Sequence, residues 1–326
     1  MQPLTFDELQ SKMRGFQESR ILLTAVELDL FTHVGSGATA TEVARRAGTD
    51  PRATEILLNA LAAIGALLKK NGAFFNTPAT AQYLVAGSPD FARPALMHTV
   101  HLFDSWAALT QCVRAGTAVH RPDPEAADPQ WTESFIEAMH WRAQKDAAEL
   151  ARIGRARNVR RMLDVGGGSG VYSIAFAKAN PALHAEVFDR EPVTRIARRH
   201  ILAEGLEDRV TTRVGDLTRD DLGSGYDLVL LSAICHMLSP EENRSLLARC
   251  FRALAPGGRL LIRDFILDPG KTSPPQAALF AVNMLVNTRG GSTYTEEEYT
   301  AWLREAGFAG ISREAAGLIA AVRAAR

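Results

Sequence analysis

Residues 162–170 read MLDVGGGSG, an apolar run that ends in a cluster of glycines. The run predicts a buried strand, and the apolar pattern from Val171 onward predicts a helix. Gly166 can form the tight turn between them, and Gly168 and Gly170 let the backbone approach a ligand at the helix N-terminus. Such a strand–turn–helix unit is typical of α/β sheets that bind small molecules.

An acidic residue follows the glycines at an informative distance. Asp189 ends the next predicted strand, about 20 residues beyond the loop. An acid in that position accepts hydrogen bonds from the hydroxyls of a bound ribose. We therefore expect this part of the chain to bind a nucleoside. A glycine turn with a purely structural role is the alternative.

The glycine spacing discriminates between nucleosides. A dinucleotide site has the pattern G-x-G-x-x-G, whereas this loop reads G-x-G-x-G and Asp164 stands just before it. A carboxylate disfavours a neighbouring pyrophosphate but favours the ammonium and sulfonium groups of S-adenosylmethionine. The pattern therefore favours S-adenosylmethionine as the cofactor.

From about residue 159 to the end, predicted strands alternate with predicted helices, which indicates a doubly wound α/β sheet. The predicted strands are Met162–Val165, Ala185–Phe188, Val210–Val214, Asp227–Ser232 and Arg259–Phe265. The predicted helices are Val171–Ala179, Pro192–Ala203 and Glu241–Leu254.

The first 100 residues predict a separate, mostly helical domain. The TATE sequence at 39–42 is a capping box before one helix, and Pro51 opens the next. Asn71-Gly72 then joins two short strands as a hairpin. This order is that of a winged helix-turn-helix. Residues 101–158 predict further helices.

The N-terminal domain carries more apolar surface than a small domain needs. Leu9, Met13 and Phe16 follow helical spacing, and the stretch Ile21–Phe31 is apolar almost all round. We interpret that stretch as one helix buried on several sides. The surplus in that stretch predicts a homodimer formed through this domain. It comprises Ile21, Leu22, Leu23, Val26, Leu28, Leu30 and Phe31.

Composition excludes several classes of protein. Among 326 residues, 46% are hydrophobic and 23% charged, and 37 basic residues balance 37 acidic ones. These values argue against disorder and against an overall field that attracts nucleic acid or anionic membranes. No apolar run approaches the ~18 residues of a membrane span. The three scattered cysteines have no metal-binding spacing, and the first residues lack a signal-peptide pattern, so we expect a cytoplasmic protein without a metal.

Taken together, these motifs resemble the two-domain S-adenosylmethionine-dependent O-methyltransferases of plant and bacterial secondary metabolism. The matching stretches are LDVGGGSG at 163–170, FDR at 188–190, GDL at 215–217, ICHMLSPEEN at 234–243, PGGRLLIRDFIL at 256–267, GGSTYTEEEY at 290–299 and AGF at 306–308. The resemblance implies three regions: a winged-helix dimerisation domain (1–100), a helical connection that contributes to the acceptor pocket (101–158), and a Rossmann-like class I methyltransferase domain (159–326).

The resemblance also implies which residues hold the cofactor. Gly166 and Gly168 would lie against its methionine end, and Asp189 would hold its ribose. Asp216 would lie beside the adenine, with Leu217 packed on the ring. The whole implied set is Asp164, Gly166, Gly168, Asp189, Arg190, Asp216, Leu217 and Ser232.

Two further residues match the catalytic groups of the family. His236 falls on the general-base histidine, and Asp264 falls on the acid that orients it. A phenol or enol is mostly protonated at pH 7, and a histidine can take its proton as the methyl group moves. A carboxylate on the other ring nitrogen would fix the tautomer and stabilise the imidazolium.

The chain departs from the family pattern beside this pair. Met237-Leu238 replaces the common Asp-Trp, and Thr293 replaces a second carboxylate of many plant enzymes. The methylated atom (oxygen, carbon or nitrogen) therefore stays open, and an enzyme that binds the cofactor without methylating is an alternative. Residues that could line an acceptor pocket, or pack in the core, are Phe103, Trp106, Phe135, Met139, His140, Met237, Met284 and Asn287.

A winged-helix regulator that binds DNA is the rival from another class. The presumed recognition helix begins at Pro51 and offers Arg52 and Glu55 before mostly apolar side chains. DNA readers need clustered Lys and Arg for the phosphates. The sequence therefore favours an enzyme that acts on a small molecule.

Overall fold

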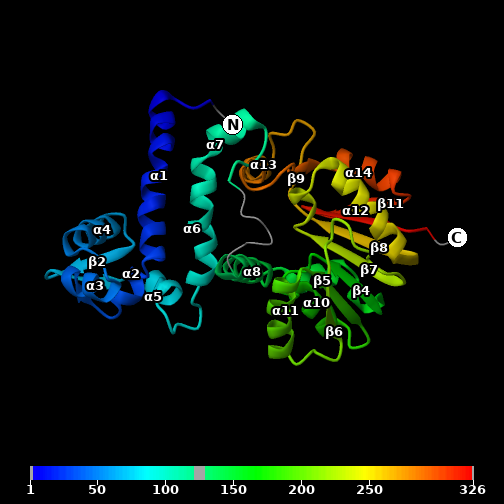
Figure 1. Cartoon of the computed structure of the whole chain (residues 1–326), viewed down its shortest axis with the longest axis horizontal. Coiled ribbons are helices and arrows are strands. Elements are labelled where there is room, and N and C mark those ends of the chain that lie inside the picture. The colour runs from blue at the N-terminus through cyan, green and yellow to red at the C-terminus, as the bar shows by residue number, and fades with distance from the viewer. Residues whose placement is uncertain (1–2, 121–128, 325–326) are drawn as a thin grey trace. The chain divides into compact units, whose positions relative to one another are not determined.

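The computed structural model describes residues 3–120 and 129–324, and its contacts divide the chain into two compact units, Met1–Phe103 and Asp104–Arg326 (Figure 1). The first unit is mostly helical, and the second contains a large sheet. Within the described ranges, no helix is both long and apolar enough to cross a membrane.

The first unit contains the predicted helix, turn, helix and hairpin, as α3, α4, β2 and β3. Its helices are α1 (Phe6–Glu27), α2 (Leu30–Val34), α3 (Ala40–Ala47), α4 (Pro51–Ala63) and α5 (Pro78–Leu84), and α6 (Arg93–Ala107) begins in it. Its strands β1 (Ala38–Thr39), β2 (Leu67–Lys70) and β3 (Ala73–Asn76) form a sheet in the order β1-β3-β2. The predicted capping box of α3 is confirmed, because Thr39 and Glu42 exchange hydrogen bonds.

The interpretation of Ile21–Phe31 as one helix is wrong. The chain breaks between α1 and α2 at Asp29, whose φ of 53° is left-handed. Arg93 holds the break: Nε donates to the carbonyl of Val26 at 2.8 Å, and Nη2 donates to that of Glu27 at 3.1 Å. The guanidinium also lies 3.5 Å from the Asp29 carboxylate. This tertiary contact is invisible to local sequence patterns.

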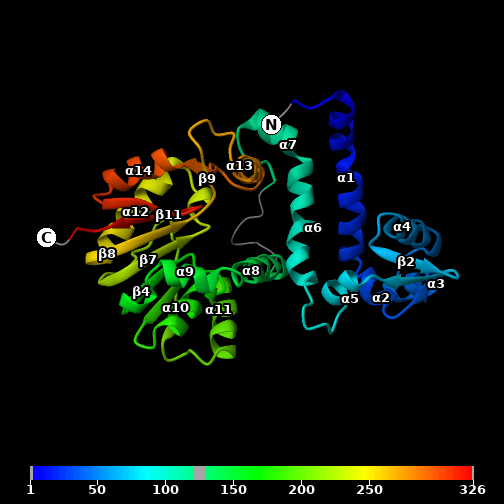
Figure 2. The ribbon, with the colours of Figure 1, turned by 180° about the vertical axis from the view of Figure 1, so that it is seen from behind.

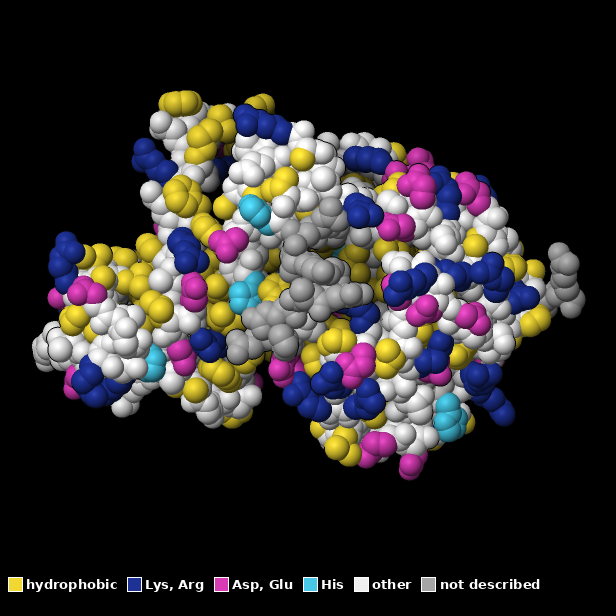
Figure 3. Space-filling model, in the orientation of Figure 1, with side chains coloured by type: hydrophobic (Ala, Val, Ile, Leu, Met, Phe, Trp, Pro, Cys, Tyr) yellow, Lys and Arg dark blue, Asp and Glu magenta, His cyan; other side chains and the backbone are white. Residues whose placement is uncertain are grey.

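The apolar residues in the first half of α1 are exposed in the single chain, whereas Ala25 and Val26 near its end are buried. Phe6, Met13 and Phe16 are 72%, 71% and 59% exposed, and Leu9 lies on the same helical face. Yellow side chains follow this helix in the space-filling view (Figure 3). Nothing in the described part of the first unit buries this face.

The second unit is a seven-stranded sheet with helices on both faces (Figures 1 and 2). Its strands, in the order β11-β12-β8-β7-β4-β5-β6, are β11 (Ala309–Ala315), β12 (Leu318–Val322), β8 (Leu254–Arg263), β7 (Tyr226–Ser232), β4 (Arg161–Val165), β5 (His184–Asp189) and β6 (Val210–Val214). Two short strands, β9 (Ile266–Leu267) and β10 (Tyr294–Thr295), form a separate parallel sheet. The helical elements are α7 (Leu109–Ala115), α8 (Pro129–Ala143), α9 (Ala147–Ile153), η1 (Ala156–Asn158), α10 (Val171–Ala179), α11 (Glu191–Ala203), η2 (Cys235–Met237), α12 (Pro240–Ala253), α13 (Pro275–Asn287) and α14 (Glu296–Glu305).

The predicted parallel sheet is confirmed, with two differences at its β8 side. The strand predicted at Arg259–Phe265 begins at Leu254 and ends at Arg263. The antiparallel pair β11 and β12 was not predicted, and β12 pairs with β8 from Leu318↔Arg263 to Val322↔Arg259. A strand whose stability comes from pairing with distant residues is hard to predict from its own sequence, because strand propensity depends strongly on context.

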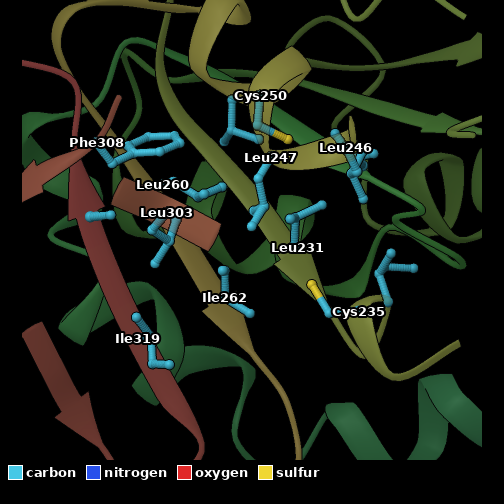
Figure 4. Close-up of a cluster of buried hydrophobic side chains, with 14 of the residues drawn as sticks. Leu231, Cys235, Leu246, Leu247, Cys250, Leu260, Ile262, Leu303, Phe308 and Ile319 are labelled. Atoms are coloured by element: carbon cyan, nitrogen blue, oxygen red, sulfur yellow. The ribbon is translucent and has the colours of Figure 1, made fainter. Parts of the chain in front are cut away.

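The central parallel strands β4 and β7 are buried on both faces. In β7, Val229 and Leu231 pack with α12 and α14, whereas Leu228 and Leu230 pack with α9, α10 and α11. Figure 4 shows Leu231, Leu260 and Ile262 among the side chains of the first of these clusters. Continuous apolar runs are typical of parallel strands covered on two sides.

Leu231→Ala is expected to destabilise the second unit by about 2–5 kcal/mol, because it opens a cavity in a fully buried cluster. Leu202→Ala is the matched control: that side chain is 64% exposed, and its loss should cost below about 0.5 kcal/mol. Urea unfolding of both variants measures the difference. Equal destabilisation would contradict this view of the core.

Candidate active site

The glycine loop lies at the carboxyl end of β4, where open α/β sheets bind their ligands. Gly166 and Gly168 have φ values of 68° and 57°, a region that favours glycine. A Cβ atom on Gly166 would lie 2.3 Å from Cδ1 of Ile234 and 3.3 Å from Cδ2 of Leu217. Only a residue without a side chain lets the loop pass this close to its neighbours.

Asp189 connects the loop to the end of β5. Its Oδ2 accepts a hydrogen bond from the backbone N–H of Gly168 at 3.0 Å, and its Oδ1 accepts one from that of Arg190 at 2.7 Å. Burial raises the pKa of this carboxyl, and the two backbone hydrogen bonds act against that rise. Each carboxylate oxygen has a second lone pair that a ligand hydroxyl could use.

Asp164 is buried beneath the loop, and one of its oxygens lacks a hydrogen-bond partner among the residues that the structure describes. Oδ2 accepts a hydrogen bond from the Ser173 hydroxyl at 2.9 Å, whereas the buried Oδ1 accepts none. Burial raises the pKa of Asp164 to about 7, and the nearby charge of Asp189 adds to the rise. A cationic group at this end of the loop would satisfy the free oxygen.

The other cofactor candidates surround the loop less directly. Leu217 lies beside Gly166, where an added Cβ atom would be 3.3 Å from its Cδ2. Ser232, at the end of β7, is half-buried. Asp216 is engaged locally, because its Oδ1 accepts from the backbone and hydroxyl of Thr218 at 2.8 and 2.6 Å. Among the described residues, no group of three His, Cys, Asp or Glu side chains is arranged to hold a metal ion.

His236 and Asp264 are brought together from two neighbouring strand ends. His236 lies in η2 after β7, Asp264 follows β8, and His236 Nδ1 is 2.6 Å from Asp264 Oδ1. Asp264 also accepts from the backbone N–H groups of His236, at 3.1 Å, and Phe265, at 2.7 Å. An accepting carboxylate places the imidazole proton on Nδ1. The Nε2 lone pair is then available, and no described residue hydrogen-bonds to it.

The surroundings of His236 are aromatic on one side and apolar on the other. Phe280 of α13 meets the imidazole edge-on, with 4.9 Å between the ring centroids. It also stacks on Phe265, with 4.1 Å between the centroids. Neither phenylalanine was predicted from the sequence, since no spacing rule shows which rings reach His236. The preceding residue, Cys235, is fully buried in the cluster drawn in Figure 4. Burial, with the Asp264 charge, raises the pKa of its thiol well above the ordinary value.

The loop after α13 contacts η2 closely. A Cβ on Gly291 would lie 2.3 Å from the carbonyl oxygen of His236, so this position requires glycine. Thr293 is buried, and its hydroxyl donates to the carbonyl of Ala277 at 3.1 Å. Its role is thus to fasten the loop to α13.

The predicted acceptor-lining residues fall in four places. Phe103 belongs to the first unit, where Arg20 lies 5.0 Å over its ring. Met284 and Asn287 are on α13, whose Asn283 Oδ1 accepts from Trp106 Nε1 at 3.0 Å. The third group is on α8 and comprises Phe135, Met139 and His140. Met237, in η2, is 36% exposed.

Comparison with known proteins agrees with this geometry. Residues 117–309 match the O-methyltransferase domain family, and residues 11–86 match the O-methyltransferase dimerisation domain. A 3-hydroxy-5-methyl-1-naphthoate 3-O-methyltransferase of Streptomyces sahachiroi is 37% identical over 95% of this chain and 93% of its own. The tetracenomycin polyketide synthesis 8-O-methyl transferase TcmO of Streptomyces glaucescens is 31% identical over 94% of this chain and 91% of its own.

A solved structure, PigF with SAH, superimposes with a TM-score of 0.90 at 28% identity and covers 98% of this chain and 100% of that chain. Its ligand is S-adenosylhomocysteine, the form that S-adenosylmethionine takes after losing its methyl group. The loop, the acid at the end of β5 and the unpartnered carboxylate oxygen of Asp164 fit such a cofactor. The chain therefore belongs to the S-adenosylmethionine-dependent O-methyltransferases that carry an N-terminal dimerisation domain.

Proposed function

We propose that this enzyme methylates a hydroxyl group of a small aromatic or polycyclic metabolite, with His236 as the general base. The observation that carries the proposal is the 2.6 Å contact between His236 Nδ1 and Asp264 Oδ1 at the carboxyl edge of the sheet. The similar enzymes named for a hydroxynaphthoate and for tetracenomycin support an aromatic or polycyclic acceptor.

The loop residues would hold the cofactor in a fixed orientation. Gly166 and Gly168 would pass along its methionine end, Asp189 would accept hydrogen bonds from the ribose, and Asp164 would face the ammonium group. Arg190, Asp216, Leu217 and Ser232 complete the proposed set. The cofactor supplies a methyl group activated by a positively charged sulfur, and alignment with the acceptor lowers the barrier by up to roughly 7–11 kcal/mol.

His236 would take the proton of the acceptor hydroxyl at Nε2. Asp264 then stabilises the imidazolium, because its carboxylate is fully buried beside Nδ1 and screened little by water. Thr293 is committed to the Ala277 carbonyl, so His236 acts without a second carboxylate. Trp106, Met284 and Asn287 are the second unit's candidates for lining the acceptor pocket, together with the α8 residues Phe135 and Met139 and, in η2, Met237.

His236→Gln is expected to lower kcat on a phenolic acceptor by about 10²–10⁴-fold, the usual contribution of a positioned base. The affinity for S-adenosylhomocysteine should stay within about twofold, since the imidazole would face the acceptor. Asp264→Asn should cost less, because the proton acceptor remains. The double variant should be no slower than His236→Gln alone, because the two residues act as a unit.

The control for this series is His184→Gln, an exposed histidine at the first residue of β5. Amine and carbon acceptors run in parallel address the alternatives of N- or C-methylation, and a chain that methylates none of them would point to other cofactor chemistry. If His236→Gln retains more than about a tenth of wild-type kcat on the phenol, the base assignment is wrong.

S-adenosylhomocysteine binding is expected to release protons at about pH 6. The pKa of Asp164 is about 7 in the unliganded chain, so the carboxyl is then mostly protonated. An ammonium beside it favours the charged form and lowers that pKa in the complex. Affinity should therefore rise as the pH approaches 7 and level off above it.

Calorimetry in buffers of different ionisation enthalpy counts the released protons. Asp164→Asn keeps an oxygen for the Ser173 hydroxyl and should abolish most of the release, whereas Asp208→Asn, at an exposed position, should leave it unchanged. A wild type that binds the ligand at pH 6 without proton release would place the ammonium elsewhere.

We infer that the enzyme is a homodimer joined through the first unit. The match of residues 11–86 to the dimerisation domain supports this inference. So does the exposed apolar face of α1, defined by Phe6, Leu9, Met13 and Phe16. Such a face is costly in water and is stabilised when a second copy covers it.

Replacing Met13 and Phe16 together by Glu is expected to dissociate the dimer, because charges would replace its apolar contacts. Light scattering should then give one chain of 35.4 kDa instead of two. Ser11→Glu, on the opposite helical face, is the control and should leave the dimer intact. A monomeric wild type at micromolar concentration would contradict the inference.

A further inference from the structure

Ser169, in the glycine loop, has a buried hydroxyl whose one hydrogen-bond partner in the described chain comes from α8. The residue is 3% exposed, and its Oγ lies 2.8 Å from Nδ1 of His140. On either side of Ser169 are Gly168 and Gly170, so this contact acts directly on the part of the loop that precedes α10. His140 thus joins α8 to the cofactor loop.

The other nitrogen of His140 shows which way this hydrogen bond runs. His140 Nε2 lies 2.9 Å from the amide nitrogen of Gln144, and an amide NH₂ group can only donate. Nε2 must then accept, so the imidazole proton is on Nδ1 and is donated to Ser169 Oγ. The hydroxyl hydrogen of Ser169 is left available for another acceptor.

His140 keeps this neutral tautomer at pH 7. Burial lowers its pKa to about 4, and the imidazole of His200, stacked on it at 3.9 Å, adds to the effect. Glu137 and Glu204 act in the opposite direction. Glu137 is engaged by His200 Nε2 at 3.2 Å, and Arg199 lies 3.9 Å from the same carboxylate. A positive charge on His140 is therefore disfavoured.

The next element favours a negatively charged ligand group. The N-cap of α10, Gly170, offers no side chain to the first-turn N–H groups, and the first turn of this nine-residue helix contains no acidic residue. The N-terminus of a helix attracts anions. A buried hydroxyl with a donor hydrogen to spare, one residue before this N-cap, points to the same kind of ligand.

We propose that His140 is a positioning residue that turns the Ser169 hydroxyl into a hydrogen-bond donor for the carboxylate of S-adenosylmethionine. Ser169 and the N-terminus of α10 would take the carboxylate, and Asp164 would take the ammonium. The two ends of the zwitterion are thereby distinguished, which fixes the orientation of the sulfonium. This assignment rests on the cofactor placement proposed above.

Two ligands that differ only at the amino-acid end test the proposal. S-adenosylhomocysteine carries the carboxylate, whereas 5′-methylthioadenosine keeps the adenosine and sulfur but lacks it. Ser169→Ala is expected to weaken S-adenosylhomocysteine binding by roughly 10–150-fold, the usual effect of losing a hydrogen bond to a charged group. Its affinity for 5′-methylthioadenosine should not change. Ser224→Ala, on the exposed loop before β7, is the control.

His140 is tested in the same two titrations. His140→Leu should weaken S-adenosylhomocysteine binding without affecting 5′-methylthioadenosine, and its effect should not add to that of Ser169→Ala. His140→Asn, whose amide N–H can replace the Nδ1 donor, should restore most of the lost affinity. Nitrogen-15 NMR of histidine-labelled enzyme should show His140 protonated at Nδ1.

Several results would overturn the proposal. Unchanged S-adenosylhomocysteine affinity in Ser169→Ala excludes a contact with the carboxylate. An equal loss for both ligands means that the pair only maintains the loop. A proton on Nε2 means that Ser169 donates to His140 and has no hydrogen to give. If the wild type binds both ligands equally, the amino-acid end is not held at all, and the placement of Asp164 fails as well.

Discussion

The carboxylate of Asp264 is fully buried, and the active-site edge of the sheet depends on the donors gathered around it. Two backbone N–H groups and the imidazole of His236 donate to it, and the Tyr299 hydroxyl adds a long contact at 3.5 Å. Removing a carboxylate from water costs several kcal/mol, and only such donors offset the loss. The ends of β7 and β8 are therefore held in one arrangement, in which the imidazole cannot rotate freely.

Much of this site could be predicted because its residues lie at strand ends. The apolar run 162–165 and the glycines after it define β4 and the loop, and the distance to Asp189 places the acid at the end of β5. Whether His236 and Asp264 touch could not follow from spacing alone. Their contact depends on β7 and β8 being neighbours in the sheet. The pairing of His236 with Asp264 was predicted from the resemblance to the family, because hydrophobic periodicity carries no information on strand order.

The features that were missed depend on contacts between distant residues. Arg93 ends α1 from 66 and 67 positions away, and β12 exists because β8 offers an edge to pair with. The rings of Phe265 and Phe280 stack on each other beside His236, and Phe280 comes from α13, more than 40 residues further along the chain. Local propensity carries no information on such contacts, whereas capping boxes and hairpin turns, which involve neighbours in sequence, were predictable.

The burial of Cys235 has a consequence for the chemistry next to it. A thiolate is a strong nucleophile, and one placed a single residue from His236 could compete with the acceptor for the activated methyl group. The thiol instead lies within the apolar cluster of β7, β8 and α12, and burial raises its pKa well above the ordinary value, which keeps it protonated. A buried, protonated thiol is a poor nucleophile. The carboxyl edge of the sheet therefore carries the His236 imidazole without a reactive thiolate beside it.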